Sequence, residues 1–236
     1  MRMIKIFNSS FISILKRVAF WMIFLGLAFQ LYGDKEKVPN DIRWIRQSLE
    51  YERLCEQVYQ RSTVQILKVL KKESKKQNLA VVVDLDETVL NNSLYQVERW
   101  QAGLTFTQDS WSDWVNRKEA GLVPGAKDFL ITVRKKGVRV VFLSNRMNHN
   151  LEPTRENLRL LGVLDPNDLF LLRLDKNDLK EVRRKEVTDG TGRMKKIGPL
   201  NVIGYVGDQM GDFPSGQKKE FGKTNFLLPN PMYGKW

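Results

Sequence analysis

The stretch AVVVDLDETVLNNS, residues 80–93, decides the fold expected of this chain. An apolar run leads directly into Asp84, Asp86 and Glu87, with Thr88 just behind them. A short apolar run bounded by polar residues indicates a strand buried on both faces. Acids crowded at the end of a buried strand repel one another. The stretch therefore also predicts a positive group or ligand that offsets their charge.

Three more apolar runs are predicted as buried strands, and segments with helical spacing separate them. Pro124 stands near the start of the first helical segment and Gly137 ends it, a typical pair of helix boundaries. Strands alternating with short helices predict an α/β fold with a doubly wound, mostly parallel sheet. The expected strands are LAVVVD (79–84), VRVVFLSN (138–145), DLFLLR (168–173) and NVIGYVGD (201–208), and the expected helices lie in residues 124–137, 152–162 and 176–187.

Two other segments complete the expected layout. Residues about 40–75 carry apolar side chains at helical spacing, and Asn40 is a suitable cap for the first helix. This region predicts two helices with a break near residues 61–63. Residues about 91–123 are rich in Trp and Tyr and lack a strand pattern, so they are expected to form an insertion over one rim of the sheet.

Polar residues follow several of the predicted strands. The carboxyl ends of parallel strands meet at one edge of a sheet, where such folds bind their ligands. We therefore expect side chains that are distant in sequence to converge there. They are Asp84 and Asp86 where the first strand ends, Ser144, Asn145 and Arg146 where the second ends, Asp208 at the end of the last, and Lys180 at the start of the helix before it.

The chemistry of this set favours a metal-assisted phosphoryl site. Asp84, Asp208 and Asp212 offer only oxygen ligands, which suits Mg²⁺. The chain has one histidine and one cysteine, His149 and Cys55, so no cluster of the kind that binds zinc is available. A lysine and a serine, Lys180 and Ser144, add the positive charge and the hydrogen-bond donor that a phosphoryl group requires.

Four ordered motifs resemble those of the haloacid dehalogenase (HAD) superfamily: VVVDLDETVL, FLSNR, Lys180 in LKEVRRKE, and GDQMGDF. The pair Trp111 and Trp114 in the insertion and the terminal LPNPMYGKW are similar to the pattern of the class C (subfamily IIIB) acid phosphatases within it. The resemblance covers roughly residues 40–236. It implies a HAD-like, Rossmannoid domain over residues 34–236 with a small helical cap.

The resemblance also implies roles for the motif residues. Asp84 would be the nucleophile that forms an aspartyl-phosphate, and Asp86 the general acid and then base. Ser144 and Lys180 would hold the phosphoryl oxygens. The implied Mg²⁺ ligands are Asp84, Asp86 through its backbone carbonyl, Asp208, and Asp212 either directly or through a bound water. Substrate contacts are expected from Ser144, Asn145, Arg146, Tyr95, Trp111, Trp114 and Tyr233, with a core role as the alternative for the two Trp residues.

The amino terminus differs in kind from the rest. Residues 1–33 carry four basic residues and no acid, and their second half, VAFWMIFLGLAFQLYG (18–33), is an apolar run, which together is the pattern of a secretory signal peptide. An uncleaved membrane anchor is the alternative. Either interpretation places the remainder outside the cytoplasm, in the periplasm or cell envelope. If residues 1–33 are uncleaved, they are expected to be the only membrane contact.

The net charge of +12 leaves +8 after residue 33 and suits anionic partners. Basic stripes with interleaved aromatics are absent from the sequence, so nucleic acid is not an expected partner. The function expected is an exported, Mg²⁺-dependent acid phosphatase for phosphate monoesters. The resemblance implies 5′-nucleotides, nicotinamide mononucleotide and aryl phosphates as substrates, and a homodimer is a further expectation. The alternative function is a non-catalytic, metal-dependent surface protein that binds phosphate or nucleotides.

Overall fold

The computed structural model describes residues 38–72, 77–216 and 218–234. Residues 40–236 form one compact unit, and every helix and strand discussed below belongs to it. The expected signal peptide or anchor, residues 1–33, lies outside the described residues. Among the residues described, no helix combines the length and the apolar character needed to cross a bilayer.

Five parallel strands form the central sheet, and its order is β5-β4-β1-β6-β7. The central strand β1 (Leu79–Val83) pairs with β4 (Arg139–Met147) on one side and β6 (Asn201–Gly207) on the other. The outer strands are β5 (Leu169–Arg173) and β7 (Asn225–Leu227). The four predicted strands and the α/β fold class are therefore confirmed. The sequence did not indicate β7, because three residues are too short to show a strand period.

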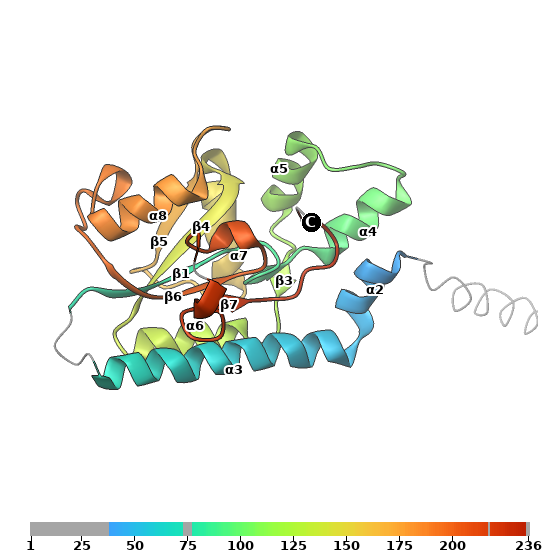
Figure 1. The fold of residues 1–236 in the computed structure, drawn as a ribbon. Coiled ribbons are helices and arrows are strands. Elements are labelled where there is room, and N and C mark those ends of the chain that lie inside the picture. Colours follow the sequence, from blue (N-terminus) through green and yellow to red (C-terminus); the bar gives the residue numbers. More distant parts are fainter. Residues whose placement is uncertain (1–37, 73–76, 217, 235–236) are drawn as a thin grey trace, which may run out of the picture. The chain divides into compact units, whose positions relative to one another are not determined.

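Helices cover both faces of this sheet (Figure 1). Successive side chains of β1 point to opposite faces, as the strand period requires. Val81 and Val83 belong to a core shared with α3 (Leu49–Lys72) and α6 (Ala126–Lys135). Ala80 and Val82 belong to the core shared with α8 (Lys180–Asp189). Burial on both faces explains why β1 is a continuous apolar run.

The amino-terminal helical region divides at Ser48, and the predicted break near residues 61–63 is wrong. Helix α2 spans Asn40–Gln47, and α3 continues without interruption through residues 61–63. The hydroxyl of Ser48 accepts a hydrogen bond from the backbone N–H of Tyr51 at 3.1 Å, which caps the start of α3. The hydroxyls of Ser62 and Thr63 instead donate to the carbonyl of Tyr59, so they are satisfied inside the helix.

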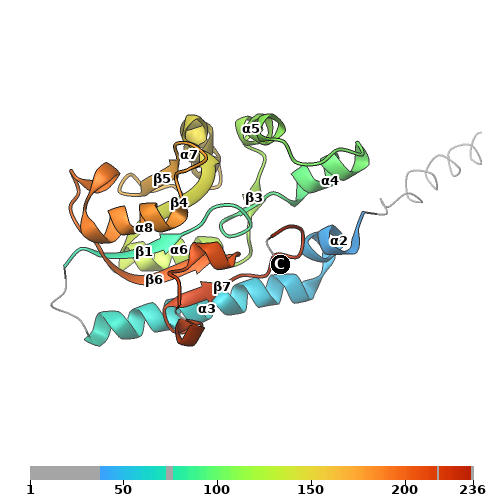
Figure 2. The same ribbon diagram turned by 45° about the horizontal axis from the view of Figure 1, so that its top comes forward.

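Residues 91–123 form a small helical cap segment at the end of the sheet towards which β1 runs (Figures 1 and 2). The antiparallel strands β2 (Leu90–Asn91) and β3 (Gly121–Leu122) pair at its base. They enclose α4 (Ser93–Gln101) and α5 (Gln108–Arg117). These two-residue strands are the part of the segment that the sequence pattern did not indicate.

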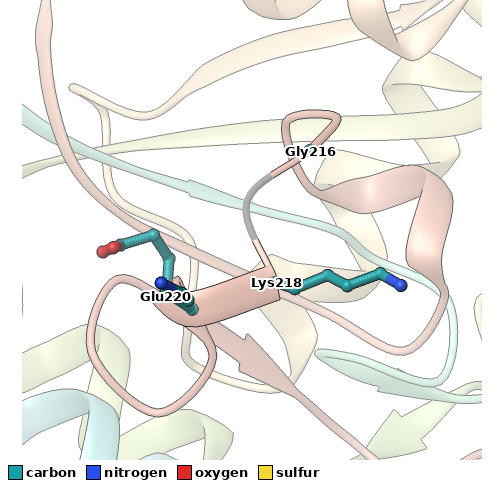
Figure 3. Close-up of a pocket in the computed structure, with 4 residues that line it drawn as sticks. Gly216, Lys218 and Glu220 are labelled. Carbon is teal, nitrogen blue, oxygen red and sulfur yellow. The ribbon is translucent and has the colours of Figure 1, made fainter.

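The remaining elements connect the strands. They are α7 (Leu151–Leu160) and the 3₁₀ turns η1 (Asn148–Asn150), η2 (Gly192–Met194), η3 (Met210–Asp212) and η4 (Lys218–Glu220). A hollow beside η4 is lined by Gly216, Lys218, Lys219 and Glu220 (Figure 3). None of the residues predicted for the active site belongs to this lining.

Candidate active site

Asp84 stands at the first position after β1, at the centre of the sheet. Its backbone N–H donates to the carbonyl of Val206 in β6 at 2.9 Å, so the sheet ladder fixes its backbone. Its side chain is 7% exposed. A carboxylate in this position projects from the edge where a parallel sheet binds its ligands.

Lys180 supplies the positive charge that the acids require. It is the first residue of α8, and its ammonium group contacts the carboxylate of Asp84 and lies 2.5 Å from Oδ1 of Asp212. Burial lowers the pKa of Lys180, but the charges of Asp84 and Asp212 outweigh that effect and raise it above its usual value. Lys180 therefore stays protonated in its buried position.

The aspartates that follow β1 and β6 form one acidic cluster. A carboxylate oxygen from each of Asp84, Asp208 and Asp212 lies within 4.8 Å of the others. Burial, together with the charge of Asp212, raises the pKa of Asp208 to about 7. Burial raises the pKa of Asp84 well above its usual range, although Lys180 opposes the shift. An all-oxygen, crowded acidic cluster fits a hard divalent cation.

The turn after β6 orients Asp212 toward this cluster. Oδ2 of Asp212 accepts hydrogen bonds from the backbone N–H groups of Asp208 at 3.1 Å and Gln209 at 2.9 Å. Its Oδ1 is the atom that meets Lys180. A Cβ at Gly207 would lie 2.4 Å from Cβ of Asp212, so the close approach requires glycine there.

Asp86 lies beside the end of β4 rather than inside the acidic cluster. Its carboxylate accepts from Nε of Arg146 at 2.9 Å and from a terminal nitrogen of the same guanidinium at 2.7 Å. Asn92 donates to it at 3.1 Å, and the hydroxyl of Ser144 lies 3.4 Å away. Asp86, Ser144 and Arg146 are thus brought together, and Arg146 is fully buried.

The carboxy-terminal segment completes the site with Asn230, which was not predicted for it, and with Tyr233, which was. The side-chain amide of Asn230 donates to Oδ2 of Asp208 at 2.8 Å. Tyr233, predicted as a substrate contact, donates through its hydroxyl to the buried carboxylate of Glu87. Burial raises the pKa of Glu87 well above its usual range. The motif LPNPMYGKW marked this segment, but its pattern did not identify Asn230 as the partner of Asp208.

Arg183 is a further residue that the sequence analysis missed. It is fully buried in α8 and donates to the carbonyl of Leu171 at 3.0 Å and to the side-chain oxygen of Asn145 at 2.7 Å. Burial lowers the pKa of Arg183 to about 10. The exposed Asn145, predicted as a substrate contact, therefore has a partner in the helix that carries Lys180.

The aromatic residues of the cap segment pack against one another. The ring centroids of Tyr95 and Trp111 are 5.0 Å apart, and those of Tyr95 and Trp114 are 6.1 Å apart. The indole of Trp114 donates to Oδ1 of Asn92 at 2.9 Å. Tyr95, Trp111 and Trp114 are buried, so in this structure they form the core of the cap segment. Their contact with a substrate stays a prediction.

Three comparisons bear on the identity of this site. Residues 31–236 match the family model described as HAD superfamily, subfamily IIIB (acid phosphatase). The structure is similar to the crystal structure of a class C acid phosphatase from Bacillus anthracis with tungstate bound, with a TM-score of 0.71 and 29% sequence identity. That similarity covers 83% of this chain and 84% of the other.

Curated plant proteins are more distant relatives. The chain is 27% identical over 154 residues to the stem 28 kDa glycoprotein of Glycine max, and 28% identical over 152 residues to acid phosphatase 1 of Solanum lycopersicum. Each alignment covers 64% of this chain, and it spans only 58% and 57% of the two relatives, respectively. The family model covers all of residues 34–236, and the motif residues Asp84, Lys180 and Asp208 meet at one edge of the sheet. The chain therefore belongs to subfamily IIIB, the acid phosphatases, of the HAD superfamily.

Proposed function

We propose that this protein hydrolyses small phosphate monoesters through a phosphorylated Asp84. The observation that carries the proposal is the meeting of Asp84, Asp208 and Asp212 with Lys180 at the carboxyl ends of β1 and β6. Family membership and the similarity to a class C acid phosphatase support it.

The proposed reaction has two steps, transfer of the phosphoryl group to Asp84 and then hydrolysis of the aspartyl-phosphate. A carboxylate oxygen of Asp84 forms a bond to phosphorus while the bond from phosphorus to the alcohol oxygen breaks. Asp86 gives its proton to the departing alcohol oxygen. Asp86 then takes a proton from water as the water oxygen bonds to phosphorus and the bond to Asp84 breaks. The products are the alcohol and phosphate, and both aspartates return to their starting forms.

The side chains around Asp84 neutralise negative charge and bind the phosphoryl group during this reaction. Lys180 offsets the negative charge of Asp84 and Asp212 and binds phosphoryl oxygens together with Ser144. A Mg²⁺ ion would be held by Asp84, Asp208, Asp212 and the backbone carbonyl of Asp86, and when bound it stabilises the negative charge of the phosphoryl group.

The substrate range and cellular location belong to the same proposal. 5′-Nucleotides, nicotinamide mononucleotide and aryl phosphates are the proposed substrates, on the strength of the class C resemblance. Export to the periplasm or cell envelope is proposed from the sequence pattern of residues 1–33. Immunoblotting of cell fractions tests the location, and recovery of the protein in the cytoplasmic fraction would contradict it.

Purified protein tests the activity directly. Hydrolysis of p-nitrophenyl phosphate and of 5′-nucleotides should require Mg²⁺ and stop in EDTA. Asp84→Asn should lower kcat by at least about 10³-fold, since it removes the nucleophile. Asp128→Asn, an exposed position on α6, is the matched control and should retain activity. Binding of phosphate without any turnover would instead favour the non-catalytic alternative.

A further inference from the structure

We propose that Arg146 is a positioning residue that holds the carboxylate of Asp86 in the orientation needed for proton transfer and does not bind the substrate. The inference rests on the proposed function, because that function gives Asp86 the role of general acid and base. The role proposed for Arg146 therefore differs from the substrate contact that the FLSNR motif led us to expect.

The geometry of the pair is a two-point clamp. Nε of Arg146 lies 2.9 Å from Oδ1 and 3.2 Å from Oδ2 of Asp86, and a terminal nitrogen lies 2.7 Å from Oδ1. Because two nitrogens bind Oδ1 and Nε also reaches Oδ2, the planar guanidinium holds the carboxylate in both position and orientation. A lysine at this position would provide charge without that planar constraint.

The remaining surface of Arg146 is already engaged inside the protein. Its other terminal nitrogen donates to the hydroxyl of Thr154 in α7 at 3.0 Å. Its guanidinium carbon lies 5.7 Å from the centroid of the Trp111 ring. The side chain has no exposed surface, whereas that of Asp86 is 16% exposed. Each guanidinium nitrogen of Arg146 thus already has a protein partner and its side chain has no exposed surface, so Asp86 is the member of the pair that a substrate can reach.

The clamp treats the two oxygens of Asp86 differently. Oδ1 accepts three hydrogen bonds of 2.7 to 3.1 Å, two from Arg146 and one from Asn92. Oδ2 has two longer contacts, 3.2 Å to Arg146 and 3.4 Å to the hydroxyl of Ser144. Oδ2 is thus the less engaged oxygen, and we assign the proton transfer to it. Ser144, a proposed phosphoryl ligand, lies on that side.

The test compares two leaving groups in one preparation of the protein. An aryl phosphate releases a stable phenolate without protonation, whereas an alkyl phosphate needs the general acid. Arg146→Lys and Arg146→Gln should lower kcat/KM for glycerol 2-phosphate by about 10²-fold, and that for p-nitrophenyl phosphate by less than about fivefold. The ratio of the two values does not depend on the fraction of folded protein, so a poorly folding variant still gives an answer.

A double-mutant cycle asks whether Arg146 acts through Asp86. In the Asp86→Asn background, adding Arg146→Lys should change kcat/KM for glycerol 2-phosphate by less than about twofold, because the group that it positions is gone. Equal losses for both substrates, or additive losses in the cycle, would overturn the inference.

A matched control exists at the opposite end of the sheet. Arg134 of α6 also forms a two-point pair, with Asp168, at 2.7 and 3.0 Å. Asp168 immediately precedes β5, away from the strand ends that carry the site. Arg134→Lys should leave the substrate ratio unchanged. Wild-type protein that hydrolyses neither substrate would defeat the proposed function and this inference together, whereas an active wild type with equal losses in the variants defeats only the inference.

Discussion

Asp84, Asp208 and Asp212 are tolerated in one buried cluster because a lysine from another element reaches them. The Lys180 ammonium meets two of the three carboxylates, and its side chain is only 11% exposed. Removing one partner from a buried charge cluster leaves the other charges without compensation. Lys180 is therefore expected to contribute to both stability and catalysis.

Substitution of Lys180 tests this expectation. Lys180→Met should lower the free energy of unfolding by about 3 kcal/mol in EDTA and lower kcat by at least about 10²-fold. Urea titration and steady-state kinetics provide the two measurements. Lys185→Met changes an exposed residue of the same helix and should affect neither. If Lys185→Met abolished activity and Lys180→Met did not, the assignment of the lysine would be wrong.

Asn230 is expected to tune the affinity of Asp208 for a cation. Its amide holds Oδ2 of Asp208 at 2.8 Å, and partners of this kind orient metal ligands. Asn230→Ala should weaken Mg²⁺ binding by about 10-fold or more, measured by isothermal titration calorimetry. Asn201→Ala is the control, because Asn201 begins β6, while Asp208 follows its end. Unchanged affinity in Asn230→Ala would show that Asp208 needs no such partner.

The strands of at least five residues were predictable from sequence, because burial on both faces leaves a mostly continuous apolar run. Strand β7 was not predictable, since Asn225–Leu227 has no period of its own and depends on pairing with β6. Asp84 and Lys180 were predictable because each stands at the end of a recognisable element. The partners Asn92 and Asn230 were not, because a hydrogen-bond partner is chosen by tertiary placement and not by local pattern.

The boundary between α2 and α3 could not be predicted from local sequence either. Ser48 and Ser62 are equivalent by residue type, but only Ser48 accepts from a backbone N–H at a helix start. Ser48→Ala should therefore lower the free energy of unfolding by about 1 kcal/mol, measured in urea. Thr63→Ala should cost less than about 0.5 kcal/mol, since its hydroxyl bonds back into its own helix. A larger loss in Thr63→Ala than in Ser48→Ala would contradict the position of the boundary.

The molecule as a whole should respond to pH through its acidic cluster. Burial raises the pKa of Asp208 to about 7 and that of Asp84 above its usual range. Without a cation, the folded state therefore retains protons that the unfolded chain has released above about pH 4. The unfolded state binds fewer protons in this window, so the contribution of the cluster to stability is present at low pH and is lost as pH rises through about 7.

Thermal unfolding in EDTA should reveal this loss. Between pH 5 and pH 7, the Tm of the wild type should fall relative to the Tm of Asp208→Asn, because Asp208 titrates and asparagine does not. Mg²⁺ should reverse the trend by binding the ionised carboxylates. A difference in Tm that is constant across this range would mean that Asp208 has an ordinary pKa in the folded protein.

The central position of β1 should hold the two halves of the protein together if the chain is cut. The exposed residues 102–107 join α4 to α5, so a protease that nicks them leaves β1 on one fragment and β4 and β6 on the other. Because β1 is hydrogen-bonded on both sides, the two fragments should co-elute in size-exclusion chromatography and separate only in denaturant. Such a nicked protein would be a noncovalent heterodimer, with the reacting carboxylate on one polypeptide and the lysine that neutralises it on the other.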